Sequence, residues 1–75
     1  MVLSMGFDYS KLRGRIREVF STQEAFASAM GMSTTTLSAK LNNKVEWSQK
    51  EISKAAEVLN IPAEEIPAYF LTLKA

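Results

Sequence analysis

The sequence predicts an all-α protein, a compact bundle of about five short helices formed by a single domain. Three observations lead to this fold class. Apolar residues recur at helical spacing in successive segments, and helix-capping residues and a glycine mark where these segments begin and end. The 75 residues, 47% of them hydrophobic, suffice for one small helical core. A domain of this size buries about 60% of its unfolded surface.

The composition argues against catalysis and metal binding. The chain has no cysteine, which excludes a disulfide, a thiolate metal site and a cysteine nucleophile. It has no histidine either, so the usual general base and the commonest metal ligand are missing. Glu64 and Glu65 lie at an expected helix start, where carboxylates complement the helix dipole. We therefore expect no enzyme activity, no cofactor and no small-molecule ligand.

Targeting signals are missing, and the charge is unevenly distributed. No apolar run approaches the ~20 residues that span a bilayer, and the start of the chain lacks the regions of a signal peptide. We therefore expect a cytoplasmic protein that does not contact a membrane. The net charge is +1, but residues 1–44 carry six basic and three acidic side chains, whereas residues 45–75 carry three basic and five acidic ones. The basic part contains the central helix pair described below.

The N-terminal part is expected to form an arm, residues 1–7, followed by a first helix over Tyr9–Phe20. Asp8 is placed to cap this helix. The core-facing positions of the helix are expected at Leu12, Ile16, Val19 and Phe20. Arg13 and Arg17 are one helical turn apart, and like charges at this spacing repel slightly. The pair either binds phosphate groups or is an ordinary solvated face, and the sequence favours neither.

The centre of the chain, residues 22–43, is expected to form two short helices joined by a tight turn. The first helix runs over Gln23–Met30. Its N-terminal cap is either a capping box begun by Ser21 or the side chain of Thr22. Gly31 is expected to end this helix, because glycine adopts a left-handed conformation without a steric penalty.

The second helix of the pair is expected over Thr34–Leu41, with Ser33 as its N-cap. Leu37 and Leu41 share its apolar face, while the short side chains of Thr34, Thr35, Ser38 and Ala39 face elsewhere. A helix, a glycine turn and a second helix with short polar side chains form the layout of a helix-turn-helix. In that motif the second helix enters the major groove of DNA. An αα-hairpin within a small bundle fits the apolar spacing equally well.

A fourth helix is expected over Gln49–Leu59. Ser48 caps it, and Glu51 completes a capping box. Trp47 and Ile52 are spaced as a hydrophobic staple, so a structural role is expected for the tryptophan.

A short fifth helix is expected to begin at Pro62, after Asn60 has ended the fourth. Pro67 is expected to stop it. The tail, residues 67–75, is apolar and could form a strand or a helical turn. Its candidate contacts with a second copy or another protein are Tyr69, Phe70, Leu71 and Leu73. Packing of Phe70 and Leu73 into the core is the simpler alternative.

The run TQEAFASAMGMSTTTLSAKLNNK, residues 22–44, resembles the lambda-repressor-like DNA-binding family of Cro proteins, phage repressors and XRE-type regulators. In that family the first motif helix opens with glutamine, contains a buried alanine and ends in glycine. The likeness continues at residues 52–61 and 62–66, which look like the family's fourth and fifth helices. Where the family's second motif helix ends in Asn-Gly, this chain has Asn42-Asn43. The resemblance implies a lambda-repressor-like domain with a central helix-turn-helix.

The resemblance also implies a set of DNA contacts. The expected base-reading residues, on the second helix of the pair, are Thr34, Thr35, Ser38 and Ala39. The expected phosphate-binding residues lie on the first helix and around the ends of the central pair: Arg13, Arg17, Thr22, Gln23, Lys40, Asn42, Asn43 and Lys44. For the two asparagines an ordinary helix C-cap is an equally good interpretation. Threonine discriminates bases less than the glutamine of other family members, so direct readout is weak or DNA shape supplements it.

Two functional hypotheses follow. The leading one is a sequence-specific Cro-like regulator of a phage or prophage, which binds a short double-stranded DNA operator as a homodimer in the bacterial host cell. The alternative is a switch modulator or antirepressor that acts mainly by binding a partner repressor protein. The near-neutral charge, four methionines and an apolar tail favour the alternative. A steep loss of affinity with salt is expected for DNA binding and not for an apolar protein interface.

Overall fold

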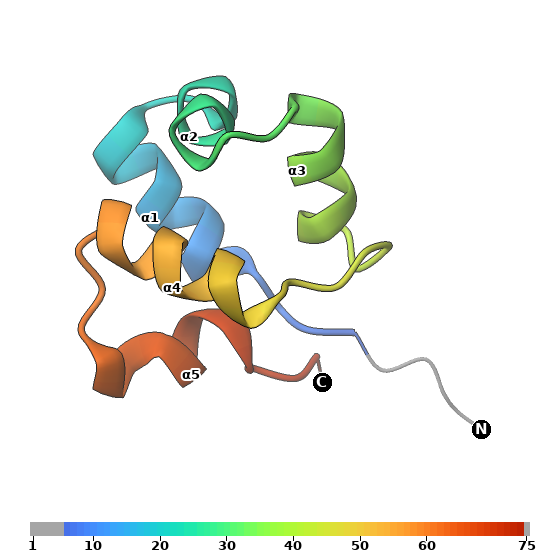
Figure 1. The fold of residues 1–75 in the computed structure, drawn as a ribbon. Coiled ribbons are helices and arrows are strands. Elements are labelled where there is room, and N and C mark those ends of the chain that lie inside the picture. Colours follow the sequence, from blue (N-terminus) through green and yellow to red (C-terminus); the bar gives the residue numbers. More distant parts are fainter. Residues whose placement is uncertain (1–5, 75) are drawn as a thin grey trace.

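The structure, a computed structural model, describes residues 6–74 and consists of short helices packed around one core. Its elements are α1 (Ser10–Phe20), α2 (Gln23–Met30), α3 (Thr34–Leu41), α4 (Gln49–Val58), a 3-10 helix (Ala63–Glu65) and α5 (Ile66–Phe70). Helix α2 packs against α1, α3 and α4, and α5 packs against α1 and α4 (Figure 1). The prediction of an all-α bundle of about five helices is confirmed. Within the described range, no helix combines the length and apolar character that crossing a membrane requires.

Side-chain caps set the beginnings of the helices. The hydroxyl of Thr22 accepts a hydrogen bond from the N–H of Ala25, so Thr22 and not the alternative Ser21 caps α2. Ser33 caps α3 in the same way, as predicted. Ser48 and Glu51 form the predicted capping box at α4. Each cap satisfies a backbone donor that the first helical turn leaves without a partner.

The start of α1 differs slightly from the prediction. The carboxylate of Asp8 accepts a hydrogen bond from the N–H of Ser10, at 2.9 Å. Helix α1 therefore begins at Ser10, one residue later than expected, and Tyr9 turns into the core. The two hydrogen bonds that Ser10 contributes lower the pKa of Asp8.

Helices α2, α3 and α4 end in the same backbone arrangement. The residues at their ends with positive φ are Gly31, Asn43 and Asn60. In each case the next N–H bonds back to a carbonyl of the last helical turn, as in a Schellman motif: Met32 to Ala27, Lys44 to Ala39 and Ile61 to Ala56. The prediction that Gly31 and Asn60 end their helices is confirmed.

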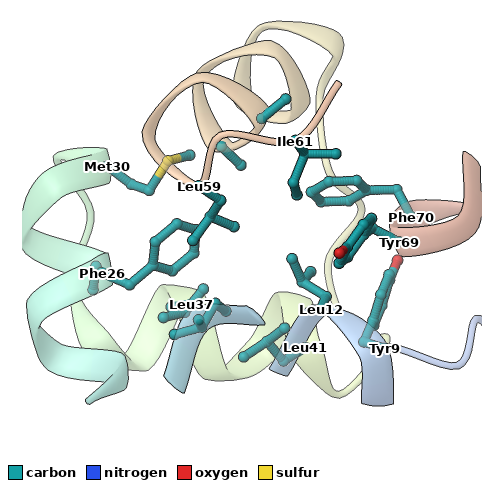
Figure 2. Close-up of a cluster of buried hydrophobic side chains, with 14 residues drawn as sticks. Tyr9, Leu12, Phe26, Met30, Leu37, Leu41, Leu59, Ile61, Tyr69 and Phe70 are labelled. Atoms are coloured by element: carbon teal, nitrogen blue, oxygen red, sulfur yellow. The ribbon is translucent and has the colours of Figure 1, made fainter. Parts of the chain in front are cut away.

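The core is one cluster of apolar side chains to which all five α-helices and their connections contribute (Figure 2). Phe26 and Leu37 have no exposed surface, and burial of such a side chain contributes roughly 1.5–3 kcal/mol. One predicted core position is wrong. Val19 is 39% exposed, because no element of the described bundle covers that part of α1, and Tyr9 is buried instead.

The C-terminal tail begins as a helix, which corrects the prediction for Pro67. The 3-10 helix ends at Glu65, and Pro67 lies in the first turn of α5, where its missing N–H leaves no hydrogen bond unmade. Tyr69 and Phe70 of α5 are buried in the core, so for Phe70 the simpler alternative, packing into the core, is confirmed. Contact of the two residues with a partner stays a prediction. Leu71 and Leu73 are exposed and remain candidates.

The two ends of the described chain pair with each other. Phe7 and Leu73 form an isolated antiparallel bridge. Its hydrogen bonds run from the N–H of Asp8 to the carbonyl of Thr72, at 2.7 Å, and from the N–H of Lys74 to the carbonyl of Gly6, at 3.1 Å. The predicted arm, residues 1–7, is therefore held in place at Gly6 and Phe7, and its first five residues lie outside the described range.

Candidate functional site

An open hollow on α2 and α3 gathers most of the residues that the sequence selected for DNA contact. It is lined by Gln23, Glu24, Thr34, Thr35, Ser38, Ala39, Asn42 and Lys44. We call this set the α2–α3 surface. All four expected base-reading residues belong to it, as do three of the expected phosphate-binding residues.

The apolar face of α3 fixes the orientation of this surface. Leu37 and Leu41 are buried in the core, which turns Thr34, Thr35 and Ser38 toward solvent. The hydroxyl of Thr36 receives a hydrogen bond from the cap residue Ser33 and lies outside the hollow. Helix α3 thus contributes short hydroxyl and methyl groups to this surface.

The α2–α3 surface is nearly neutral. Its only charged members are Glu24 and Lys44, one of each sign. Arg17 and Thr22 are exposed beside a smaller neighbouring hollow that shares Gln23 with the α2–α3 surface. A protein that binds DNA through many phosphate contacts needs a concentration of positive charge, and the described surface provides few cations here.

Lys40 does not contact phosphate in this arrangement, contrary to the prediction. Its side chain is only 6% exposed, and its Nζ lies 2.9 Å from Oε1 of Glu51. The ammonium also donates a hydrogen bond to the carbonyl of Glu46 and lies over the Trp47 ring. A buried lysine requires such a counter-charge. The sequence spacing alone did not reveal that α4 supplies it.

Glu51 therefore has two roles, as capping residue and as counter-ion. Its carboxylate accepts a hydrogen bond from the N–H of Ser48 at 2.8 Å. This bond, and the neighbouring Lys40 ammonium, lower the pKa of Glu51. The pair links the last turn of α3 to the first turn of α4.

The half-buried Arg13 bonds to the end of α3. Its guanidinium donates to the carbonyl of Leu41 at 3.2 Å and to Oδ1 of Asn42 at 3.1 Å. A cation at this position complements the C-terminal end of α3. One nitrogen of Arg13 therefore caps α3, while Arg13 also lines the smaller hollow together with the exposed Arg17, and its phosphate contact stays a prediction.

The two asparagines that follow α3 form a helix cap, the second of the two predicted alternatives. Asn42 accepts from Arg13 and donates to the hydroxyl of Ser38. The side-chain amide of Asn43 bonds to both the N–H and the carbonyl of Phe7. The side chain of Asn43 is therefore not available to a phosphate.

A second hollow, which sequence reasoning missed, lies between the end of α3, the start of α4 and the tail. It has a volume of about 380 Å³ and is lined by Phe7, Tyr9, Asn43, Val45, Glu46, Trp47, Ile52, Phe70 and Leu71. We call it the aromatic hollow. Burial raises the pKa of Tyr9, and the Glu46 carboxylate raises it further. The residues of the aromatic hollow come from four separate segments of the chain, so no local sequence pattern predicts it.

Comparison with known proteins decides the family. Residues 5–72 match the family described as "Protein of unknown function (DUF739)". The chain belongs to the DUF739 family. It is also 51% identical to a protein whose solution structure is known, the modulator of repression (MOR) of the temperate bacteriophage TP901-1 from Lactococcus lactis. The two structures superpose with a TM-score of 0.77 over 87% of this chain and 88% of that one. No curated protein matches the chain.

These findings correct the family assignment. The chain is similar to a modulator of repression and not to a Cro or XRE-type repressor. The residues that suggested the Cro and XRE-type family have a structural role in the α2–α3 helix pair. Ala27 is buried where α2 packs, and Gly31 has the positive φ that the turn requires. Such residues specify how two helices meet and leave open which molecule binds them.

Proposed function

We propose that this DUF739 protein modulates repression in a temperate bacteriophage by binding a partner repressor protein. The proposal rests on its 51% identity to the modulator of repression of phage TP901-1, over most of both chains. On this proposal the protein is not an enzyme, and it acts in the cytoplasm of the bacterial host, where the repressor and its operators are found.

The observation that carries the proposal is the near-neutral α2–α3 surface. Of the cations that the sequence assigned to phosphate, Lys40 is buried against Glu51, and the half-buried Arg13 is bonded to the end of α3. Lys44 remains on the surface, and Glu24 offsets it. Neutralising several DNA phosphates takes several exposed cations. A protein partner has no such requirement, and short polar side chains suit a protein interface.

Operator binding is the second candidate. The exposed hydroxyls of Thr34 and Thr35 at the start of α3 favour it, because this is where a helix-turn-helix protein reads bases. Lys44 belongs to the same surface, and Arg17 lines the neighbouring hollow, so both are candidates for contact with the DNA backbone. The two candidate functions differ in the molecule bound, a repressor protein or operator DNA, and in how steeply the binding affinity falls with salt.

The deciding experiment compares two partners under the same conditions. The purified protein is titrated against the full-length repressor encoded in the same phage genome, and against promoter fragments from that genome, at about 50 and 200 mM salt. Binding to the repressor with no selective binding to any fragment supports the proposal. Selective, steeply salt-dependent binding to one fragment, with no affinity for the repressor, would overturn it in favour of operator binding.

A further inference from the structure

We infer that the aromatic hollow is the docking site for the partner repressor, which inserts one apolar side chain flanked by a basic one. This inference rests on the proposed function and adds to it the location and the chemistry of the contact.

Aromatic rings form the walls of the hollow. The rings of Trp47 and Phe70 meet edge to face with centroids 5.2 Å apart, and Tyr9 meets Trp47 in the same way at 6.4 Å. Phe7 extends the series, 6.2 Å from Tyr9. Rings that hold one another in this way are worth about 0.5–1.5 kcal/mol per pair beyond burial. The rings thus form the walls of an open hollow into which an apolar group can fit.

The rim of the hollow is exposed and apolar. Val45 is 47% exposed and Leu71 is 55% exposed. Leu73, at 56%, lies beside them through its bridge to Phe7. Among residues 6–74 these are three of the four large apolar side chains left exposed. Their clustering around a concave site indicates an interaction surface, since scattered exposed apolar residues are ordinary and gathered ones are not.

The backbone around the hollow is held in place from both sides. The Lys40 ammonium bonds to the carbonyl of Glu46, and the amide of Asn43 bonds to Phe7. The capping box at Ser48 anchors the end of the loop. A site whose loop is already ordered loses little conformational entropy on binding.

Charge indicates what flanks the inserted side chain. Glu46 is the only charged residue that lines the hollow, and its carboxylate is not part of an ion pair within the described residues. The nearby Lys40 is already neutralised by Glu51. An acidic rim beside an apolar hollow selects a basic neighbour on the partner. A DNA-binding repressor presents basic side chains, so the chemistry of the two surfaces matches.

Trp47 provides a direct spectroscopic probe of the hollow, because it is the only tryptophan in the chain. Its indole N–H is buried and has no hydrogen-bond partner within the described residues. If the protein is labelled with 5-fluorotryptophan and the repressor is not, a single ¹⁹F resonance reports on the hollow. Occupation of the hollow by the repressor is expected to shift this resonance.

The test uses three matched substitutions, V45E, L71E and V19E. All three place a carboxylate at an exposed apolar position, but Val19 lies on α1 outside the hollow. We expect V45E and L71E to weaken repressor binding by about tenfold or more, because each places a carboxylate where the partner's apolar side chain would have to displace its water. We expect V19E to bind like the wild type. Far-UV circular dichroism checks that each variant is folded, and V45S and L71S replace any variant that is not.

The possible outcomes separate the inference from the proposed function. If the wild type binds the repressor while V45E and L71E bind equally well and the ¹⁹F resonance stays in place, the docking site lies elsewhere and the proposed function stands. If neither the wild type nor V19E binds the repressor, the proposed function itself fails. If the resonance shifts with protein concentration in the absence of repressor, a second copy occupies the hollow and the inference is overturned.

Discussion

The side-chain amide of Asn43 occupies the place of a neighbouring β-strand beside Phe7. Its Oδ1 accepts from the N–H of Phe7 at 2.8 Å, and its Nδ2 donates to the carbonyl of the same residue at 3.0 Å. The opposite side of Phe7 is paired with Leu73. One asparagine, at the end of α3, therefore completes the pairing of the N-terminal segment and ties it to the helix pair.

We expect N43A to lower the free energy of unfolding by about 2–3 kcal/mol. Two hydrogen bonds are worth about 0.5–1.5 kcal/mol each, and an alanine is less favourable than asparagine at the φ of 64° found here. N43G is the matched control, because glycine removes the hydrogen bonds and tolerates the backbone conformation. Urea unfolding should therefore place N43G between the wild type and N43A. Equal stability of N43G and the wild type would show that the two hydrogen bonds contribute nothing.

Gly6 and Asn43 should be energetically coupled. A Cβ added at Gly6 would lie 3.0 Å from Cγ of Asn43, tighter than most such contacts in folded proteins, so the Asn43 side chain would have to move slightly. We expect G6A to destabilise the wild type by about 1 kcal/mol, as overpacking commonly does. In the N43G background the obstructing amide is gone, so G6A should be close to neutral. A double-mutant cycle by urea unfolding measures how much the effect of G6A depends on Asn43. If G6A lowered the free energy of unfolding equally in both backgrounds, Asn43 would not be the cause of the loss.

Local chemistry explains which parts of the fold the sequence could predict. The caps at Thr22, Ser33 and Ser48, and the ends at Gly31 and Asn60, are short-range signals, because each involves residues within one or two helical turns. The boundaries of α2 and α3 follow from them. The burial of Lys40 depends on α4 and could not be read from α3 alone, since its counter-ion Glu51 is eleven positions away.

The site was only partly predictable for a similar reason. Thr34, Thr35, Ser38 and Ala39 do lie together on one surface, as helical periodicity requires. Whether that surface binds DNA or protein depends on the cations around it, and tertiary contacts bury Lys40 and bond Arg13 to the end of α3. The aromatic hollow joins Phe7, Trp47 and Phe70 across 63 positions of sequence, beyond the reach of any periodic pattern.

Arg13 and Arg17 should behave differently although they are one turn apart on α1. We expect R13A to lower stability by about 1 kcal/mol, because its guanidinium bonds to the carbonyl of Leu41 and to Asn42 at the end of α3. R17A should stay within about 0.5 kcal/mol of the wild type, since Arg17 is exposed. Thermal and urea unfolding of the two variants provide the comparison. Equal losses would mean that the bonds of Arg13 to α3 are not what stabilises the fold.

The ion pair of Lys40 and Glu51 should make stability depend on pH in a defined direction. The pKa of Glu51 is lowered in the folded protein, first by the N–H of Ser48 and then by Lys40. A carboxyl with a lowered folded pKa stabilises the protein above its unfolded pKa, at about 4.3, and this contribution is lost as the pH falls through the folded pKa.

E51Q keeps the shape of the capping box but removes the charge, which leaves the buried Lys40 ammonium without its counter-ion. Because the Glu51 side chain is 30% exposed, we expect a moderate loss of about 1–2 kcal/mol at pH 7. As the pH falls through the lowered folded pKa, the wild-type carboxyl becomes protonated, so the difference between the two proteins should shrink. Urea unfolding of both proteins at pH 7 and at about pH 3.5 measures this, and a loss that is the same at both values would exclude the ion pair as its source.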